Sequence, residues 1–459
     1  MTSDLDGPRT PFESATRSRV LSWALVAVCL GYFMVILDTT IVNVALPAMR
    51  ADLHADVSGL QWVVDAYLLM LAALLLTGGV LADRFGARLV CQVGLGVFVV
   101  ASVGCAVAPN VAILVIARLV QGIGAALAVP ASLALLRAAY PEAGARARAI
   151  GVWGGIAGIA AAAGPILGGV LVTSAGWRLV FVVNVPIGVA AIVLTARHVP
   201  APPPRARSLD PAAQVVGVLG LAALTLALID GGRDGLTAPA VAAGLVFIAA
   251  TIAFVVIERR AAAPMLPLGL FTDRTFAGAT AVGLLINLGF YGELFVLNLY
   301  FQQVLGYSAL LAGVALLPQM GMAVVGSAAS GRVTARAGSP RPTMLIGLVT
   351  GGAGLLGLTV AAAHPPYWAL VLPLVATGFG MSFTMPAATT AVVDGAPADR
   401  AGLAAGTINA ARQVGGVVGV AVLGALVAGS TFVAGLRIAL VIAGGVFLVG
   451  AALTAVTCP

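Results

Sequence analysis

Two acidic residues stand alone inside long apolar stretches of the sequence. Asp38 lies in GYFMVILDTTIVNVALP, and Glu293 lies in FYGELFVLNLY. A charge at the centre of a lipid bilayer costs at least about 2.5–3.5 kcal/mol, so an acid retained there is a candidate functional residue. Burial disfavours the charged form of a carboxyl group, so such an acid can bind a proton on one side of a membrane and release it on the other. Asp38 and Glu293 are therefore candidate proton-coupling residues.

The two acids lie at the same depth along their segments. Asp38 follows Arg19 by 19 residues, and Glu293 follows Arg274 by 19 residues. Since an α-helix advances by about 1.5 Å per residue, both carboxyl groups lie roughly 28 Å from the start of their helices. We expect them to face a central cavity, although carboxylates at this depth could also reach the outer headgroups or cap a neighbouring helix.

Arg118 is a third charge within an apolar segment. It could hold Asp38 ionised, with Gln121 one turn further along the same helix face, or it could extend to the outer membrane interface. Asp65 lies near the outer end of its segment, in QWVVDAYLLM, and we assign it to the interface. The polar and aromatic side chains that could line a substrate cavity are Asn43, Gln121, Asn287, Tyr291, Asn298 and Gln319.

The composition is that of a protein embedded in a membrane. Of the 459 residues, 61% are hydrophobic and 9% are charged, whereas a soluble protein has about 25% charged residues. All 24 Lys/Arg positions are arginine, so the lysine that a P-loop ATPase needs is missing. The net charge of +7 does not indicate nucleic acid, because the arginines stand singly in short loops. The 4 cysteines and 3 histidines form no cluster, so we expect no metal site, no cofactor and no enzyme active site.

Fourteen apolar segments are long enough to cross a bilayer as helices. The predicted fold is therefore an all-α polytopic membrane protein, and an even number of spans puts both termini on one side. With the N-terminus in the cytoplasm, cytoplasmic segments hold 18 of the 24 arginines and outer segments hold 4, while Arg118 and Arg412 lie within spans. This excess follows the positive-inside rule, and we expect a location in the cell membrane. The segments are 20–46, 59–80, 89–108, 111–136, 149–173, 177–196, 212–230, 237–257, 275–303, 308–330, 342–362, 366–391, 402–428 and 434–456.

The sequence repeats itself over six of these segments. GVLADRFGAR from Gly79 matches GRVTARAGSPR from Gly331, 252 residues later, and GIGAALAVPA from Gly122 matches GFGMSFTMPA from Gly378, 256 residues later. Both matches pair spans eight apart, so spans 1–6 correspond to spans 9–14, with spans 7 and 8 inserted. The predicted division is a cytoplasmic tail (1–19), a six-helix bundle (20–197), a linker with two inserted helices (198–274) and a second six-helix bundle (275–459).

Five motifs in order give the chain a family resemblance. They are LDTTIVNVALP (Leu37–Pro47), GVLADRFGARLV (Gly79–Val90), RLVQGIGAALAVPASLALL (Arg118–Leu136), GIAAAAGPILGGVL (Gly158–Leu171) and WRLVFVVNVPIGV (Trp177–Val189). With these motifs the chain resembles the fourteen-span drug–proton antiporter branch of the major facilitator superfamily over essentially its whole length. In that fold, two six-helix halves are related by an axis along the membrane normal.

The resemblance implies roles for three groups of residues. The arginine that matches Arg118 is implicated in proton transfer, so Arg118 joins the two acids in the predicted proton-coupling set. The loop motif resembles a conformational switch that steadies the outward-open state, although its arginines could also serve orientation alone. The fifth-span motif is associated with antiporters, and its small residues let helices approach closely, slide or bend. The expected switch residues are Gly79, Asp83, Arg84, Gly86 and Arg88, and the expected hinge residues are Gly158, Gly164, Pro165, Gly168 and Gly169.

The acids and the resemblance together predict a secondary active transporter. It would export amphipathic, cationic drugs or natural products in exchange for protons by alternating access, because a bound cation and a proton can compete for one carboxylate. The alternative is an uptake carrier of the same fold, a symporter or uniporter for a small organic solute. The expected partners are protons, a small-molecule substrate and the lipid bilayer, without nucleic acid, and we expect a monomer.

Overall fold

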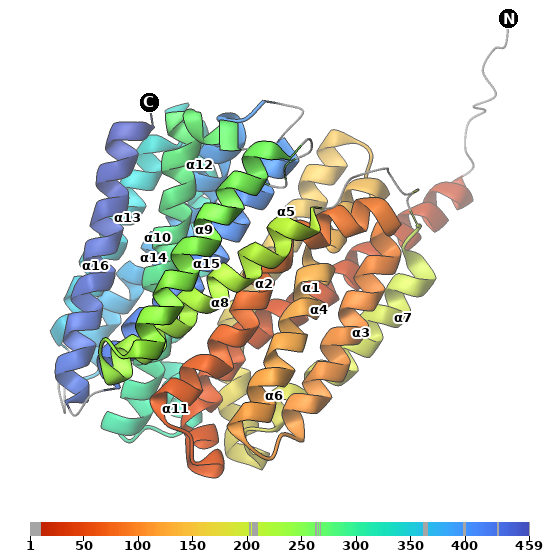
Figure 1. Cartoon of the computed structure of the whole chain (residues 1–459). Coiled ribbons are helices and arrows are strands. Elements are labelled where there is room, and N and C mark those ends of the chain that lie inside the picture. Colours follow the sequence, from red (N-terminus) through yellow and green to blue (C-terminus); the bar gives the residue numbers. More distant parts are fainter. Residues whose placement is uncertain are drawn as a thin grey trace, which may run out of the picture.

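The computed structural model describes residues 11–201, 203, 210–261, 264, 266, 268–360, 366–397, 401–428 and 431–458. Within these residues the regular secondary structure is helical, with no strand, and 14 stretches are long and apolar enough to cross a membrane. The start of the first helix and the end of the last lie at the same end of the bundle, which we call the termini side (Figure 1). The predicted all-α fold with fourteen spans is confirmed.

Seven helices form the first half of the bundle. α4 packs against α2 and α3, and α1 packs against α5 and α7. The sixth predicted span is broken at Val183, because Pro186 has no N–H to donate to the carbonyl of Val182. The helices are α1 (Pro11–Leu53), α2 (Val57–Phe85), α3 (Ala87–Ala106), α4 (Val111–Ala139), α5 (Ala143–Ala175), α6 (Leu179–Val182) and α7 (Asn184–His198).

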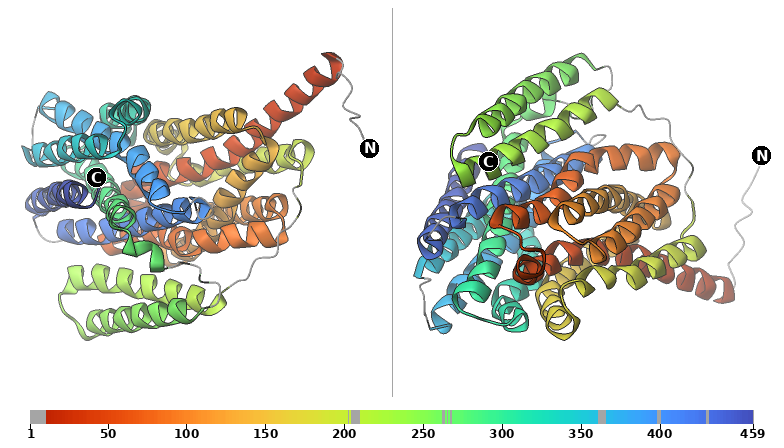
Figure 2. Two further views of the ribbon diagram at one scale, coloured as in Figure 1. Left: turned by 90° about the horizontal axis from the view of Figure 1, so that it is seen from above. Right: turned by 60° about the horizontal axis from the view of Figure 1, so that its bottom comes forward.

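Two inserted helices form a hairpin beside the halves. They are α8 (Pro211–Asp234) and α9 (Ala238–Arg260), and Figure 2 draws them as a separate pair at the edge of the molecule. α8 also contacts α2 and α15, whereas α9 packs mainly on α8. Large apolar side chains of α9, such as Leu245, Ile248 and Ile252, are exposed. A helix that is apolar on its exposed face fits a lipid environment.

The second half repeats this arrangement. α14 packs against α12 and α13, and α10 packs against α15 and α16. The tenth predicted span is broken at Leu316, because Pro318 cannot donate to the carbonyl of Val314. The elements are η1 (Leu268–Thr272), α10 (Arg274–Leu299), η2 (Tyr300–Val304), α11 (Ala309–Ala315), α12 (Leu317–Ala337), α13 (Arg341–Gly357), η3 (Leu358–Val360), α14 (Trp368–Asp394), α15 (Ala401–Val427) and α16 (Phe432–Thr457).

Repeated glycines hold equivalent helix pairs together in the two halves. A Cβ atom on Gly122 of α4 would lie 2.5 Å from the carbonyl oxygen of Tyr67 in α2. A Cβ atom on Gly378 of α14 would lie 2.1 Å from the carbonyl oxygen of Gln319 in α12. A larger residue at either position would push the helices apart, so these glycines set the same close crossing twice.

Candidate functional site

A cavity of about 1860 Å³ lies between the two halves. Most of its wall comes from residues between 71 and 83 of α2, 129 and 137 of α4, 150 and 161 of α5, and 403 and 413 of α15. α2 and α4 end at the termini side, and α5 and α15 begin there, so these segments occupy the same half of the bundle. The cavity therefore faces the termini side.

On the opposite side, the two halves are closed by direct backbone contact. A Cβ atom on Gly169 of α5 would lie 2.5 Å from the Cα of Leu310, and one on Gly313 of α11 would lie 2.1 Å from the carbonyl oxygen of Pro165. Gln61 of α2 also donates from Nε2 to two carbonyl groups of α15, at 2.9 and 3.2 Å. The chain thus adopts a conformation that is open toward the termini side alone.

The predicted hinge residues of α5 lie in three environments. Gly158 lines the cavity. Gly164 and Gly168 pack on α1, where their Cβ atoms would lie 2.0 Å from Thr40 Oγ1 and 3.0 Å from Ile41 Cγ1. The other two hinge residues, Pro165 and Gly169, make the contacts with α11 that are described above. α5 therefore joins the first helix of one half to the other half, and bending at these positions stays a prediction.

Asp38 lies at the centre of a buried hydrogen-bond network in the first half. Its carboxyl oxygens accept from Arg118 Nη1, from Gln121 Nε2 at 2.9 Å and from Asn184 Nδ2 at 2.9 Å. Gln121 Nε2 also donates to Ser102 Oγ at 2.9 Å. These five residues, the Asp38 network, come from α1, α3, α4 and α7, and each is at most 1% exposed. The network therefore ties four helices together without contact with solvent.

Arg118 is enclosed by the first half and does not extend to the membrane surface. Besides its ion pair with Asp38, its Nε donates to the carbonyl oxygen of Val63 at 2.9 Å. Its guanidinium carbon lies 4.4 Å from the centre of the Tyr67 ring, which adds a cation–π contact. The alternative of an arginine at the outer interface is wrong, because the carboxylate and these neighbours compensate its burial.

Glu293 has a different environment in the second half. It is fully buried on α10, where its Oε2 accepts from Gln319 Nε2 of α12 at 3.0 Å. Its Oε1 has no hydrogen-bond partner among the described residues. Leu374 occupies the repeat position of Arg118, so the arginine of the first half has no counterpart here. Because Gln319 lines the cavity, Glu293 is one hydrogen bond away from it.

Asp65 is buried between helices, which contradicts its assignment to the membrane interface. It is 0% exposed, and neither of its carboxyl oxygens has a hydrogen-bond partner in the described part of the chain. α2 packs against α4 and α15. Gln61, one turn earlier, bonds to α15, so helix packing covers this level of α2. The sequence position near the end of an apolar segment did not reveal that packing.

The predicted cavity residues divide into two groups. Tyr291 and Gln319 line the cavity wall. Two of the asparagines instead donate from Nδ2 to carbonyl groups four residues earlier in their own helices, both at 2.9 Å, while their Oδ1 atoms have no hydrogen-bond partner among the described residues. The residues buried outside the wall are Asn43, Gln121, Asn287 and Asn298.

Several residues of the site were not predicted from the sequence. Asn184 is the asparagine of the WRLVFVVNVPIGV motif, so a signal for it was present, whereas Ser102 stands in no motif. Arg412, Tyr32 and Trp153 line the cavity. Arg412 was recognisable as an arginine inside a span. Within the described residues, no three His, Cys, Asp or Glu side chains are grouped so that they could hold a metal ion.

The predicted switch segment joins α2 to α3 at the termini side. Gly86, with φ of 95°, ends α2 and starts α3. Arg88 Nη2 donates to the carbonyl oxygen of Ala196 in α7, which fastens the turn to the sixth span. The guanidinium of Arg84 lies over the ring of Phe85, 5.5 Å from its centre. The other two switch residues, Gly79 and Asp83, line the cavity.

At this end of α2, the close contact with α4 is made by Gly78, the neighbour of the predicted switch residue Gly79. A Cβ atom on Gly78 would lie 2.0 Å from the carbonyl oxygen of Ala126 in α4. At Gly79 the nearest atom would be Pro130 Cβ, 3.8 Å away, which is an ordinary contact. Successive residues of a helix point about 100° apart, so the sequence could not distinguish these two glycines by spacing alone.

Comparison with known sequences shows which protein family the chain resembles. Residues 28–420 and 340–459 match the Major Facilitator Superfamily. The chain is 37% identical to the methylenomycin A resistance protein of Bacillus subtilis (strain 168), over 96% of this chain and 95% of that protein. It is 39% identical to the tetracenomycin C resistance and export protein of Streptomyces glaucescens, over 88% of this chain and 75% of that protein.

Solved structures share the fold at low sequence identity. A POT family transporter in complex with a thioalcohol-conjugated peptide matches with a TM-score of 0.72 at 14% identity, over 93% of this chain and 94% of that chain. A bacterial homologue of the human lysosomal transporter Spinster, in an inward-facing and unoccupied conformation, matches with a TM-score of 0.69 at 17% identity, over 95% of this chain and 96% of that chain. The protein is therefore a multi-pass transporter of the cell membrane and not an enzyme, and it belongs to the major facilitator superfamily.

Proposed function

We propose that the protein exports an amphipathic, antibiotic-like compound from the cell in exchange for protons, by alternating access of the cavity to the two sides of the membrane. Its relatives are named for resistance to methylenomycin A, for resistance and export of tetracenomycin C, and for multidrug resistance. The arginine distribution supports a cytoplasmic location of the termini side, and with that orientation the described conformation would be the inward-open one. In that conformation the cavity would load substrate from the cell interior.

The cavity supports a substrate of drug size. Pockets for drug-sized ligands typically enclose about 300–1,000 Å³, and this cavity holds about 1860 Å³. Leucine, valine and methionine side chains supply much of its wall, together with a few polar groups such as Tyr291, Asn409 and Gln413. A wide, mainly apolar wall with few polar groups favours amphipathic compounds.

One observation carries the proton coupling: a buried carboxyl group lies one hydrogen bond behind the cavity wall. Gln319 bonds Glu293 at 3.0 Å, and Gln319 is one of the residues that line the cavity, where it is 1% exposed. Gln319 Oε1 has no hydrogen-bond partner among the described residues, and a protonated Glu293 would donate to it. A substrate donor bonded to the same oxygen would therefore compete with the proton. Glu293 in its neutral form needs no positive partner, whereas its ionised form would be buried without one. Loading of substrate and occupancy by a proton are thereby coupled at one side chain.

The Asp38 network would act as the second proton site. In the described arrangement, Arg118, Gln121 and Asn184 donate to the carboxylate, and the guanidinium of Arg118 forms its ion pair. A proton on Asp38 would remove the negative charge that Arg118 needs and would loosen the joint between four helices. A looser joint would let the helices of the first half move relative to one another when the cavity changes from inward-open to outward-open.

The cationic character expected of the substrate is not part of this proposal. That expectation depended on an acid that faces the cavity, and both Asp38 and Glu293 are 0% exposed. The substrate meets neither carboxylate directly, so a positive charge on it would have no acidic partner at these positions. Substrate and proton can compete through Gln319, or through movement of the helices, without a positive charge on the substrate.

Everted membrane vesicles test the proposal. A panel of toxic compounds is first screened for those to which expression of the wild type gives resistance. Uptake of such a compound into everted vesicles should then follow an imposed pH gradient, acidic inside, and Asp38→Asn should lower the initial rate at least about tenfold. Substitution of Gly96, which lies on α3 outside the cavity wall and whose Cβ would meet nothing within 4 Å, by alanine is the matched control. Full pH-driven uptake by Asp38→Asn vesicles would show that this carboxyl group has no role in coupling.

A further inference from the structure

Arg412 is a cation of the cavity wall that has no acidic partner among the described residues. It lies on α15 and lines the cavity. Its Nη1 donates to Asn409 Oδ1 at 3.1 Å, on the same helix, whereas its Nε is buried without a hydrogen-bond partner. No acidic side chain of the described residues forms an ion pair with it; the buried pair in the bundle is that of Asp38 with Arg118. The guanidinium therefore keeps donors that nothing in the described chain satisfies.

The other charged residues of the wall lie at helix ends. Asp83 and Arg137 belong to the last turns of α2 and α4, and Asp210 caps the start of α8 by accepting from the backbone N–H of Ala213 at 3.0 Å. These three residues surround the mouth on the termini side. Arg412, in contrast, lies eleven residues into α15. It is the one formal charge of the described cavity wall that lies deep inside the bundle.

Close packing of α15 on α10 holds Arg412 in place. Cβ atoms on Gly415 and Gly419 would lie 2.0 and 2.1 Å from carbonyl oxygens of α10, so the two backbones are in contact. A Cβ atom on Gly283 of α10 would lie 3.3 Å from Arg412 Cγ. The apolar part of the arginine side chain therefore packs against α10 at a position where the absence of a side chain makes room for it. Arg412 thus packs on α10 and also lines the cavity.

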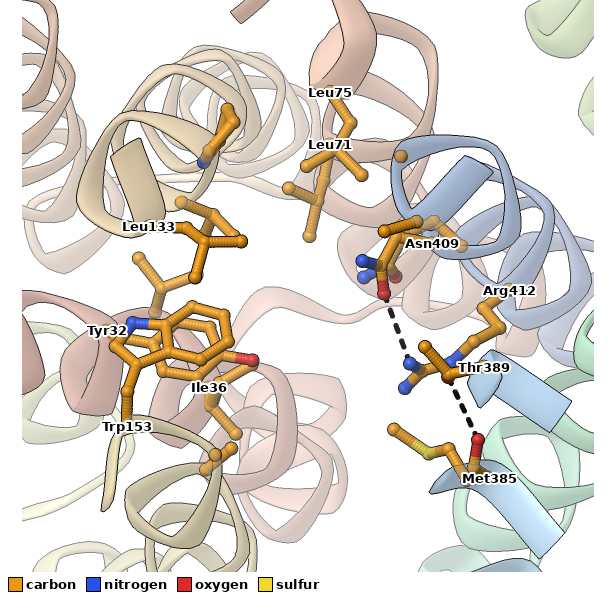
Figure 3. Close-up of a pocket in the computed structure, with 18 of the residues that line it drawn as sticks. Tyr32, Ile36, Leu71, Leu75, Leu133, Trp153, Met385, Thr389, Asn409 and Arg412 are labelled. Carbon is orange, nitrogen blue, oxygen red and sulfur yellow. Dashed lines mark hydrogen bonds between the residues drawn. The ribbon is translucent and has the colours of Figure 1, made fainter. Parts of the chain in front are cut away.

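An aromatic pair faces Arg412 across the cavity. Tyr32 of α1 and Trp153 of α5 stack with ring centres 3.7 Å apart and planes 9° apart, and Trp153 Nε1 donates to Ser132 Oγ at 3.2 Å. Figure 3 shows this pair on one side of the space and Arg412 with Asn409 on the other. The cavity thus combines a flat aromatic surface in one half of the protein with a planar cation in the other half.

We propose that Arg412 is the recognition site for an acidic group of the substrate, and that the transported compounds are amphipathic organic acids with a flat apolar body. This proposal rests on the export function proposed above and defines its substrate class. A guanidinium presents paired N–H donors that match a carboxylate, and no acidic side chain of the described residues occupies those of Arg412. The apolar body of the ligand would pack on Tyr32 and Trp153, so one compound would touch both halves.

Binding of a pyrene series to the purified full-length protein in detergent tests the substrate class. Pyrenebutanoate, the neutral pyrenebutanamide and the cationic pyrenebutylamine share one aromatic body, and energy transfer from tryptophan to pyrene reports their binding. The wild type should bind the carboxylate at least about tenfold more tightly than the amide, a difference of about 1.4 kcal/mol, and the amine most weakly. Equal binding of carboxylate and amide, or tightest binding of the amine, would overturn the proposal without any variant.

Variants of Arg412 test whether this residue causes the preference for the carboxylate over the amide. Arg412→Gln should bind carboxylate and amide within about twofold of each other, and Arg412→Lys should keep a reduced preference because lysine offers a point charge without the paired donors. Arg178→Gln, outside the cavity wall and ion-paired with Asp52, should leave the tenfold preference unchanged. A tenfold preference that survives in Arg412→Gln would exclude Arg412 as the recognition site. The assay uses no proton gradient, so absence of pH-driven transport together with an intact preference would refute the export mechanism alone.

Discussion

Separate and combined removal of Asp38 and Arg118 tests whether the buried ion pair is an energetic unit. The two side chains are 0% and 1% exposed. Removal of one partner of a buried pair leaves an uncompensated charge, which typically costs about 3–5 kcal/mol. We therefore expect Asp38→Asn and Arg118→Leu each to lower the free energy of unfolding by about that amount. Leucine is chosen because Leu374 stands at the equivalent position of the second half.

The double variant should be less damaged than the two single variants suggest. It contains no unpaired charge, and Gln121 Nε2 keeps its bond to Ser102 Oγ at 2.9 Å. A double-mutant cycle should therefore give a coupling energy of about 3 kcal/mol, at the upper end of the range for contacting residues. Denaturant titration of the purified proteins in mixed micelles measures these free energies of unfolding.

The pH dependence separates the two single variants. In Arg118→Leu, the acid left behind can avoid its charge by binding a proton, so stability should recover as the pH falls. In Asp38→Asn, the guanidinium left behind cannot lose its proton in the accessible range, so no such recovery is expected. Proton-driven transport should be lost in all three proteins, because even the stable double variant lacks the acid. Additive destabilisation, within about 0.5 kcal/mol, would refute the view that the pair acts as a unit.

Three further predictions concern the closed side, the cavity and the surface. Gly313→Val would force a side chain into the space 2.1 Å from the Pro165 carbonyl oxygen; overpacking costs about 1–3 kcal/mol, so the open-outward state should gain population, measured as faster labelling of a cysteine introduced in α11. Gln319→Ala removes the hydrogen bond that joins the cavity to the second buried acid, worth about 1.5–3 kcal/mol if that acid is charged, so pH-driven transport should fall roughly tenfold or more. Arg178→Ala breaks an ion pair with Asp52 that is 43% and 47% exposed, and the free energy of unfolding should change by less than about 1 kcal/mol. Slow labelling, unchanged transport or a large loss of stability, respectively, would contradict these expectations.

The architecture could be predicted because a bilayer imposes length and composition on every span. Apolar segments of sufficient length occur fourteen times, and the structure has a helix or a broken helix at each. The helices run beyond the apolar segments: the first predicted span ends at residue 46, whereas α1 continues to Leu53. The next helix begins where Asp56 accepts from the backbone N–H of Gly59 at 2.8 Å. Hydropathy therefore predicts the part of a helix that lies in the membrane, whereas a capping residue marks where the helix begins.

The site could be predicted only in part, because orientation about a helix axis depends on its neighbours. A charge inside an apolar segment was sufficient to select Asp38, Glu293 and Arg118. The sequence could not indicate that Asp38 pairs with Arg118 from a helix 80 residues away, since both outcomes fitted the same spacing. It also could not indicate that Asp65 is enclosed by packing or that Arg412 faces the cavity.

The most direct test of proton antiport is reciprocal transport in proteoliposomes that contain a pH-sensitive dye. A concentration gradient of a compound selected in the resistance screen is imposed without any pH gradient. The compound should move down its gradient and drive protons in the opposite direction, and Glu293→Gln should abolish the proton movement. Substrate movement by the wild type with no change of internal pH would contradict the account, because the protein would then transport its substrate without proton exchange.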